Sequence, residues 1–317
     1  MKILLLCVNL LICFGILLEE VRKEVVDKAL LNLPKRESID ILKMALAMSS
    51  AKEDYSMTDV ESAYFAYKWI SQNIELDCLG KESGHSSTLP TTTYKDGKGG
   101  EIGITELFNM ICGFLNIESN TILGVKKDYS DSYTTDDDLF ITFEYAWNYI
   151  SIDNKYYLLD VISGSGLCGY DSKFHKIPKD EYFGMEPEFS IRYLFPNNKE
   201  WQLLSKTITE EQFKSQAILD YGFFKYFNNI SPDVETIKEQ TKVKFSFKDS
   251  KIEKLYFRDC YSIEKGTTLV PEGQLIKNIN GTCEVSIRAS KRGYVFLEVS
   301  EDNKNYYKVV TYGVNIP

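Results

Sequence analysis

A glycine-rich turn that leads directly into an apolar helix is the feature that most restricts the fold of this chain. Residues 97–113 read GKGGEIGITELFNMICG. Apolar side chains follow the turn at helical spacing, at Ile104, Leu107, Phe108, Ile111 and Leu115. The turn therefore delivers Glu101 to a helix N-terminus, where free N–H groups and partial positive charge suit a carboxylate. Many enzymes use that same position to hold a nucleophile ionised.

Helices are also expected before this turn. Residues 20–33 and 39–48 predict two of them, and Thr58 with Glu61 forms the capping-box pattern that begins a third, more strongly amphipathic helix. Residues 81–96 are polar and rich in Ser and Thr, which predicts a loop leading to the glycine-rich turn.

Short strands are expected along the rest of the chain. Residues 121–126 predict one strand, and residues 139–152 and 155–162 predict a hairpin through Asp153 and Asn154, which favour tight turns. From residue 242 onward, turn residues separate five short strand-like segments, KVKFSF, KIEKLYF, CEVSIRA, YVFLEVS and NYYKVVTYGV. Such regular repetition is typical of a β-sandwich.

The hairpin has a register that the turn length determines. If a two-residue turn places Ile152 opposite Lys155, then Trp147 lies opposite Asp160. Tyr145 lies on the same sheet face, diagonal to Asp160, because side chains alternate between the two faces of a strand. We therefore expect Tyr145, Trp147 and Asp160 to share one surface.

Taken together, these motifs resemble the transglutaminase-like superfamily, which has a papain-like core. GKGGEIGITELFNMICG is similar to the family's glycine-rich turn and helix, and YAWNYISIDNKYYLLDVISGSG to its strand, turn and strand. The later stretch DEYFGMEPEFSIRYLFPNNKEWQLL, with the terminal strands, is similar to the kyphoscoliosis peptidase branch. The resemblance implies an α+β fold, with a papain/transglutaminase-like core followed by a C-terminal, Ig-like β-sandwich.

The resemblance also implies a degenerate catalytic triad. The family's nucleophilic cysteine falls on Glu101, its general-base histidine on Tyr145 and its orienting aspartate on Asp160. A carboxylate is a far weaker nucleophile toward amides than a thiolate, and a phenol with a pKa of about 10 does not cycle protons near neutral pH. Because two of the three groups are replaced, we expect the acyl-transfer cycle to be lost.

The leading interpretation is therefore a pseudoenzyme that binds another protein or serves as a scaffold through its former substrate cleft. Beside the triad positions we expect Gly99, Gly100 and Trp147 to line this cleft. Tyr145 is expected to donate its hydroxyl to Glu101 or to Asp160.

Two enzyme interpretations compete with this one. Cys168 follows Asp160 in a loop, with His175 nearby, and as a relocated nucleophile it would make the chain a thiol peptidase or protein-glutamine transglutaminase. A structural cysteine is the favoured reading of Cys168, because no turn onto a helix activates it. Glu101 and Asp160 as an acid/base pair would suggest a glycosidase, which nothing else in the resemblance supports.

The charge balance excludes some classes of partner. Against 46 acidic residues the chain has 37 Lys and Arg, for a net charge of −9, and no basic run is dense enough to follow a phosphate backbone. We therefore expect no nucleic-acid partner. The only two histidines are His85 and His175, and the cysteines show no metal-ligand spacing, so no metal or other cofactor is expected.

The N-terminal sequence MKILLLCVNLLICFGILLEE predicts secretion. One lysine precedes an apolar run, which is typical of a signal peptide and predicts one over residues 1–18. An uncleaved membrane anchor is the alternative. Residues 19–235 would then form the transglutaminase-like domain and residues 236–317 the β-sandwich. The expected partner is an extracellular protein or matrix component, with glycosylation possible at Asn280 and Asn229 and no membrane contact after signal removal.

The cysteine count fits an oxidising compartment. After removal of the signal, five cysteines are left, an odd number that leaves at least one unpaired within the chain. Cys260 and Cys283 lie in the C-terminal strand region and are the favoured disulfide pair, whereas Cys112 on the apolar helix face is expected to be a buried thiol.

Overall fold

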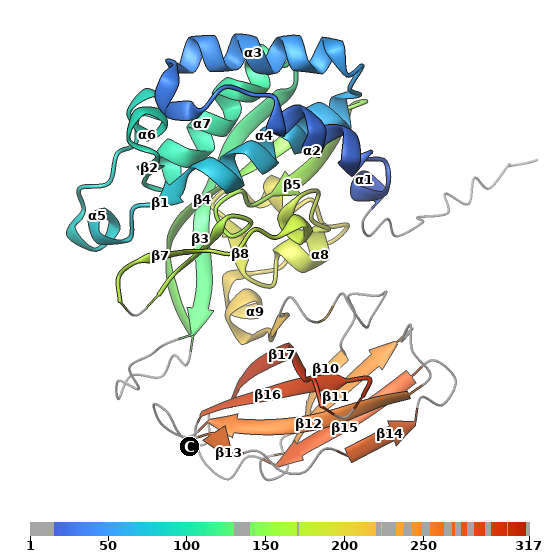
Figure 1. Cartoon of the computed structure of the whole chain (residues 1–317). Helices are drawn as coiled ribbons and strands as arrows, with labels where there is room; N and C mark the ends of the chain where they lie inside the picture. Colours follow the sequence, from blue (N-terminus) through green and yellow to red (C-terminus); the bar gives the residue numbers. More distant parts are fainter. Residues whose placement is uncertain are drawn as a thin grey trace, which may run out of the picture.

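The computed structural model (Figure 1) describes residues 16–129, 140–169, 171–219 and Phe223, and the C-terminal strands from residue 233 to residue 314 given below. The possible glycosylation sites Asn229 and Asn280 and most of the expected signal segment lie outside these residues. Within the described parts, none of the helices has both the length and the apolar character needed to span a bilayer.

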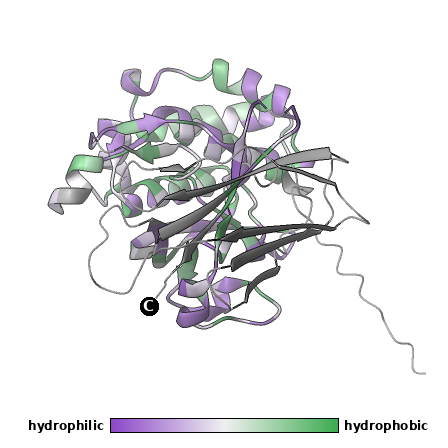
Figure 2. Ribbon diagram, turned by 90° about the horizontal axis from the view of Figure 1, so that it is seen from below, coloured by the Kyte–Doolittle hydropathy of each residue, from purple (hydrophilic) through white to green (hydrophobic). Residues whose placement is uncertain are grey.

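Helices occupy the first third of the chain and cover one face of a sheet. Their order is α1 (Ile16–Glu19), α2 (Lys23–Leu31), η1 (Arg36–Ser38), α3 (Ile41–Asp54), α4 (Asp59–Asn73), α5 (Cys78–Ser83), α6 (Pro90–Asp96) and α7 (Glu101–Phe114). Helix α7 contacts both α3 and the strands β3 and β4, so it lies between the outer helix and the sheet (Figure 1). In Figure 2 green and purple alternate along these helices, as expected where apolar side chains face a core and polar ones face water.

Helix α4 begins as the sequence predicts. The Thr58 side chain accepts from the backbone N–H of Glu61, and the Glu61 side chain accepts from the backbone N–H of Thr58, which completes a capping box. Most of the helix is buried, including Tyr64, Tyr67 and Trp69. It is therefore the central helix of the domain.

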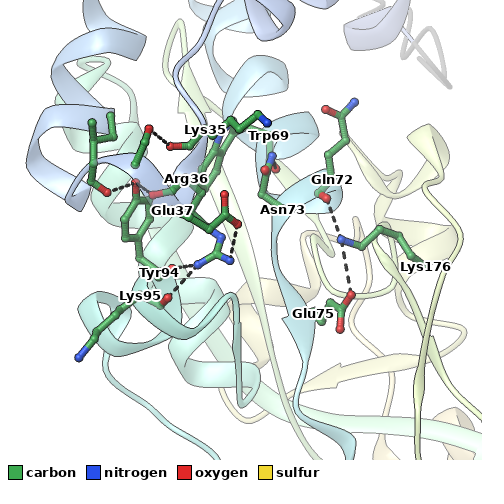
Figure 3. Close-up of polar contacts among 12 residues, drawn as sticks. Lys35, Arg36, Glu37, Trp69, Gln72, Asn73, Glu75, Tyr94, Lys95 and Lys176 are labelled. Atoms are coloured by element: carbon green, nitrogen blue, oxygen red, sulfur yellow. Dashed lines mark hydrogen bonds and ion pairs between the residues drawn. The ribbon is translucent and has the colours of Figure 1, made fainter.

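The prediction of a loop over residues 81–96 is wrong, because this segment contains the end of α5 and all of α6. Pro90 occupies the first turn of α6, where its missing N–H is no loss, and Gly97 ends the helix in the left-handed region at φ 71°. Arg36 donates to the terminal carbonyl oxygens of Tyr94 and Lys95, at 2.7 and 2.8 Å (Figure 3). Pro90 and Gly97 therefore indicate the structure of this segment better than its polar composition does.

The main sheet is antiparallel and has the order β5-β4-β3-β8. Its strands are β3 (Glu118–Tyr129), β4 (Phe140–Ile152), β5 (Lys155–Leu159) and β8 (Leu194–Pro196). Ile152 pairs with Lys155, which confirms the predicted hairpin register. Asp153 and Asn154 have φ of 52° and 61°, the positive values that a two-residue type I′ turn requires.

The smaller elements lie among the helices before α7 and between the main sheet and the C-terminal strands. They are β1 (Glu75–Leu76), β2 (Lys98–Gly99), β6 (Gly166–Cys168), β7 (Phe174–Lys176), η2 (Asp180–Tyr182), α8 (Pro187–Ser190), η3 (Lys199–Gln202), α9 (Glu210–Ser215) and β9 (Ile218–Leu219). The mixed helices and strands agree with the expected α+β class.

The C-terminal strands form two further sheets. One has the order β10-β11-β15 and the other β13-β12-β16-β17-β9, with β14 on β12. Their bounds are β10 (Asp233–Ile237), β11 (Lys242–Lys248), β12 (Lys254–Ser262), β13 (Thr268–Leu269), β14 (Gln274–Lys277), β15 (Thr282–Arg288), β16 (Gly293–Ser300) and β17 (Tyr307–Val314). Since β9 pairs with β17, the last strand before residue 220 is hydrogen-bonded to the C-terminal sheet.

A buried lysine joins the main sheet to α9. Lys127 is 1% exposed, and its Nζ donates to the carbonyl oxygens of Phe213 and Gln216, at 2.6 and 2.8 Å. These carbonyls lie at the C-terminal end of α9, where a cation is favourable. Burial, and then the charge of Arg192, lower the pKa of Lys127 to about 7.

The free energy of unfolding is therefore expected to rise with pH between about 7.5 and 9.5. The unfolded chain binds a proton at Lys127 in this range and the folded chain does not, so the slope reaches at most about 1.4 kcal/mol per pH unit. Urea unfolding at several pH values measures it. Lys127→Met should show a flatter profile than the parent, and identical slopes would contradict this assignment.

Candidate functional site

The start of α7 delivers Glu101 to the site through a tightly packed turn. Gly100 is the N-cap residue and Glu101 the first residue of the helix, as the sequence predicts. A Cβ on Gly103 would overlap the Ser87 carbonyl oxygen and the Thr93 hydroxyl, so the first turn of the helix packs directly against the preceding segment. Glu101 is partly buried, and its Oε1 atom is inaccessible to solvent.

Tyr145 and Asp160 form the centre of the site. The Tyr145 hydroxyl donates to Oδ1 of Asp160 at 3.0 Å and lies 3.3 Å from the Ser163 hydroxyl. Oδ1 of Asp160 also accepts from the backbone N–H of Ser163, at 2.9 Å. Of the two acceptors expected for Tyr145, the structure gives it Asp160.

Burial raises the pKa of Tyr145 well above its usual value, and the nearby charge of Asp160 raises it further. The phenol is 5% exposed and Asp160 is fully buried. Tyr145 therefore stays protonated at neutral pH and holds its proton against the carboxylate.

The structure adds Lys126, which the sequence analysis did not single out. Its Nζ donates to the Ser163 hydroxyl at 2.7 Å and lies 4.6 Å from the centre of the Tyr145 ring. The β3–β4 register pairs Lys126 with Phe143 and Gly124 with Tyr145, which puts Lys126 on the Tyr145 face. The β4–β5 hairpin register does not fix this pairing, so no local sequence signal marks Lys126.

Two cavities share Tyr145 in their walls. The first has a volume of about 420 Å³ and also includes Glu101, Ile102, Leu123 and Glu144. The second has a volume of about 380 Å³ and is lined by Lys126, Phe143, Ser163 and both Cys78 and Cys168, among others. Tyr145 therefore borders two separate cavities.

The residues predicted to line the cleft are placed differently. Gly99 and Gly100 are buried, and Trp147 is 1% exposed within the hydrophobic core. None of the three belongs to the walls of the two cavities. Trp147 shares the sheet face of Tyr145, as expected. It lies two residues nearer the hairpin turn, where its side chain is part of the hydrophobic core.

The cysteines differ in part from the expected pairing. Cys168 forms a disulfide with Cys78, with Cα atoms 5.8 Å apart, and Cys112 is a buried free thiol as expected. Cys260 and Cys283 lie in β12 and β15, where the backbone is described and the side chains are not, so their pairing stays a prediction. His175 is exposed, and its Nε2 lies 3.0 Å from Oδ1 of Asp171.

Comparison with known proteins decides the family. Residues 46–161 match the transglutaminase-like superfamily, and this range includes Glu101, Tyr145 and Asp160. This part of the chain is a transglutaminase-like domain. Human kyphoscoliosis peptidase is 28% identical over 203 residues, which are 61% of this chain and 30% of the relative. The mouse kyphoscoliosis peptidase is 29% identical over 169 residues, 53% of this chain and 25% of the relative.

A third relative is more distant. The Caenorhabditis elegans Lim and transglutaminase domain protein ltd-1 is 23% identical over 213 residues, 63% of this chain and 28% of that protein. The two peptidases support the kyphoscoliosis peptidase branch within the superfamily. This chain spans less than a third of the length of each of these transglutaminase-like relatives.

Proposed function

We propose that this transglutaminase-like protein is not catalytic and binds another protein through the cleft formed by the two cavities beside Tyr145. The observation that carries the proposal is the hydrogen bond from the Tyr145 hydroxyl to Asp160. The Tyr145 phenol lies where the family resemblance puts an imidazole base. Asp160, which the resemblance makes the orienting group for that base, accepts a hydrogen bond from the phenol instead.

The chemistry of the site supports the loss of acyl transfer. A base must accept the proton of the nucleophile, and Tyr145 presents a proton of its own to a buried carboxylate. Glu101, at the nucleophile position, has a carboxylate in place of a thiolate. The sulfur of Cys168 is bonded to Cys78, so a relocated cysteine nucleophile is not available in the oxidised protein.

Exposed apolar side chains around the cavities support a binding role. Ile102 and Leu123 line the first cavity and are 42% and 51% exposed. Leu167 lines the second and is 49% exposed, and Leu79, 64% exposed, follows the disulfide-bonded Cys78. Apolar side chains grouped around a polar hollow are common at sites of protein association.

The proposed setting is extracellular, with an extracellular protein or a matrix component as the partner. The N-terminal sequence supports secretion, and a disulfide between distant cysteines fits an oxidising compartment. We further propose that the two C-terminal sheets form an Ig-like β-sandwich over residues 236–317, after a transglutaminase-like domain over residues 19–235. Their alternating antiparallel strands support this arrangement.

Leu123→Asp is expected to weaken partner binding by at least about tenfold, because it places a charge in the apolar rim of the first cavity. Binding is measured on surfaces coated with purified matrix proteins and with a panel of secreted proteins. Leu42→Asp is the matched control, since Leu42 lies on the outer helix α3 and is 54% exposed. Equal loss in both variants, or no loss in either, would contradict binding through the cleft.

A further inference from the structure

The second cavity has a wall made by a short hairpin, here called the flap, whose described residues are 166–169 and 171–176. Its strands β6 and β7 pair at only three positions, from Gly166–Lys176 to Cys168–Phe174. Gly166, Leu167 and Cys168 line the cavity together with Lys126, Tyr145 and Ser163 of the domain body. The position of the flap therefore determines how open this side of Tyr145 is.

The flap buries little of its own surface. Leu167 is 49% exposed, Cys168 and His175 are exposed, and Phe174 is partly buried against the core. A segment with few buried apolar contacts and only three strand pairs opens locally at low cost unless other bonds hold it.

Two tethers hold the flap to the helical layer. The disulfide joins Cys168 of β6 to Cys78 at the start of α5. Lys176 of β7 donates through Nζ to the Gln72 carbonyl oxygen at 2.7 Å and lies 3.8 Å from Glu75 (Figure 3). The lysine contacts are exposed, so they are weak and are screened by salt. The disulfide is the stronger tether.

The disulfide is also accessible from one side. Cys168 is exposed, whereas Cys78 is 5% exposed. A thiolate from a dithiol reductant can attack the Cys168 sulfur, forming a mixed disulfide and releasing Cys78 as a thiolate that takes up a proton. The second thiol of the reductant then displaces Cys168, so the reductant is oxidised to a disulfide and the protein gains two thiols.

We propose that the Cys78–Cys168 disulfide is a redox-removable tether, and that its reduction by a dithiol frees the flap and opens the second cavity beside Tyr145. Where the cleft binds a partner, which rests on the proposed function, the oxidised protein presents the complete docking surface and the reduced protein an incomplete one. The redox state of the surroundings then regulates binding.

Hydrogen exchange of the full chain with and without dithiothreitol tests the flap directly. In the reduced protein, amides of residues 166–176 are expected to exchange at least tenfold faster, while those of α4 and α7 keep their rates. Iodoacetamide should label Cys78 and Cys168 only after reduction. Cys112 is the internal control, because it is fully buried and its burial raises the pKa of the thiol to about 12.

One variant makes the test independent of the reductant, and a second tests the weaker tether. A Cys78→Ser/Cys168→Ser protein should show the fast flap exchange without dithiothreitol. Lys176→Met should have a small effect in the oxidised protein and add to the effect of reduction.

Unchanged flap exchange after confirmed reduction would overturn the proposal. So would labelling of Cys112 with faster exchange throughout α7, which would make the disulfide a support of the whole domain. Neither readout needs a partner, so either failure leaves the Leu123→Asp binding test untouched. If the flap opens but partner binding is equal in both redox states, the regulatory consequence is wrong.

Discussion

Glu61→Gln is expected to lower the free energy of unfolding by about 1.5–3 kcal/mol, because it replaces a buried carboxylate that accepts charge-assisted hydrogen bonds from the half-exposed Arg22. Glu61 is fully buried in the first turn of α4. Its carboxylate accepts from Nε and an Nη of Arg22, at 2.6 and 2.7 Å, and from the backbone N–H groups of Arg22 and Thr58. Glutamine has one acceptor where these donors need two.

The pH dependence gives an independent check on Glu61. Its hydrogen bonds to Arg22, ahead of backbone hydrogen bonds and charge attraction, lower its pKa to about 2 despite burial. Stability from this group is thus fully present above the unfolded pKa of about 4.3 and is lost as the pH falls toward 2. Urea unfolding from pH 7 to pH 3 should show this loss in the parent and less of it in Glu61→Gln.

The matched control is an exposed glutamate that also pairs with arginine. Glu37 contacts Arg36 at 2.8 Å and its side chain is 68% exposed, so Glu37→Gln should change the stability by less than about 1 kcal/mol. If Glu61→Gln lowers the free energy of unfolding no more than this control does, the Arg22–Glu61 pair does not hold α2 to α4 as described.

Gly124→Ala is expected to cost about 3 kcal/mol or more, because the site has no room for a methyl group. Gly124 faces Tyr145 in the β3–β4 pair. A Cβ there would overlap the Phe195 carbonyl oxygen and approach Pro196 Cα to 2.8 Å and the Trp147 ring to 2.7 Å. Two of these neighbours are backbone atoms of β8 and its strand end, so the strand itself must move.

Gly113→Ala serves as the opposite case in the same domain. Gly113 lies near the end of α7, is exposed, and has no heavy atom within 4 Å of an added Cβ. Alanine is favoured over glycine in a helix, so this variant should gain up to about 1 kcal/mol. Thermal unfolding of both variants measures the contrast. A tolerated Gly124→Ala would mean that β8 is not fixed against β3.

Local signals in the sequence predicted much of the fold and of the site. The capping box at Thr58, the two-residue turn at Asp153 and the spacing of the apolar residues in α7 each have a physical cause that is local in the chain. Counting residues along the two strands from the turn was enough to predict that Tyr145 lies near Asp160. The position of Glu101 followed in the same way from the glycine-rich turn.

The features that the sequence analysis missed depend on contacts between distant segments. Cys78 and Cys168 are separated by 90 residues, and nothing in their spacing favours this pairing over a pairing with Cys260 or Cys283. Lys126 reaches Ser163 only because the third strand of the sheet lies beside the hairpin. Trp147 was predicted on the correct sheet face, but the burial of its side chain depends on which elements pack over the strand.

An activity assay of the unmodified protein tests whether this transglutaminase-like fold surrounds a site without acyl-transfer chemistry. Mass spectrometry would follow cleavage and amine incorporation in a glutamine-rich peptide library between pH 5 and 9. The Glu101→Cys/Tyr145→His double variant is assayed in parallel, since it places an imidazole beside Asp160 and a thiol at the helix start that lines the first cavity together with residue 145. We expect no turnover by the parent and measurable turnover by the double variant. Turnover by the parent, and above all turnover that disappears in Cys168→Ser, would contradict it.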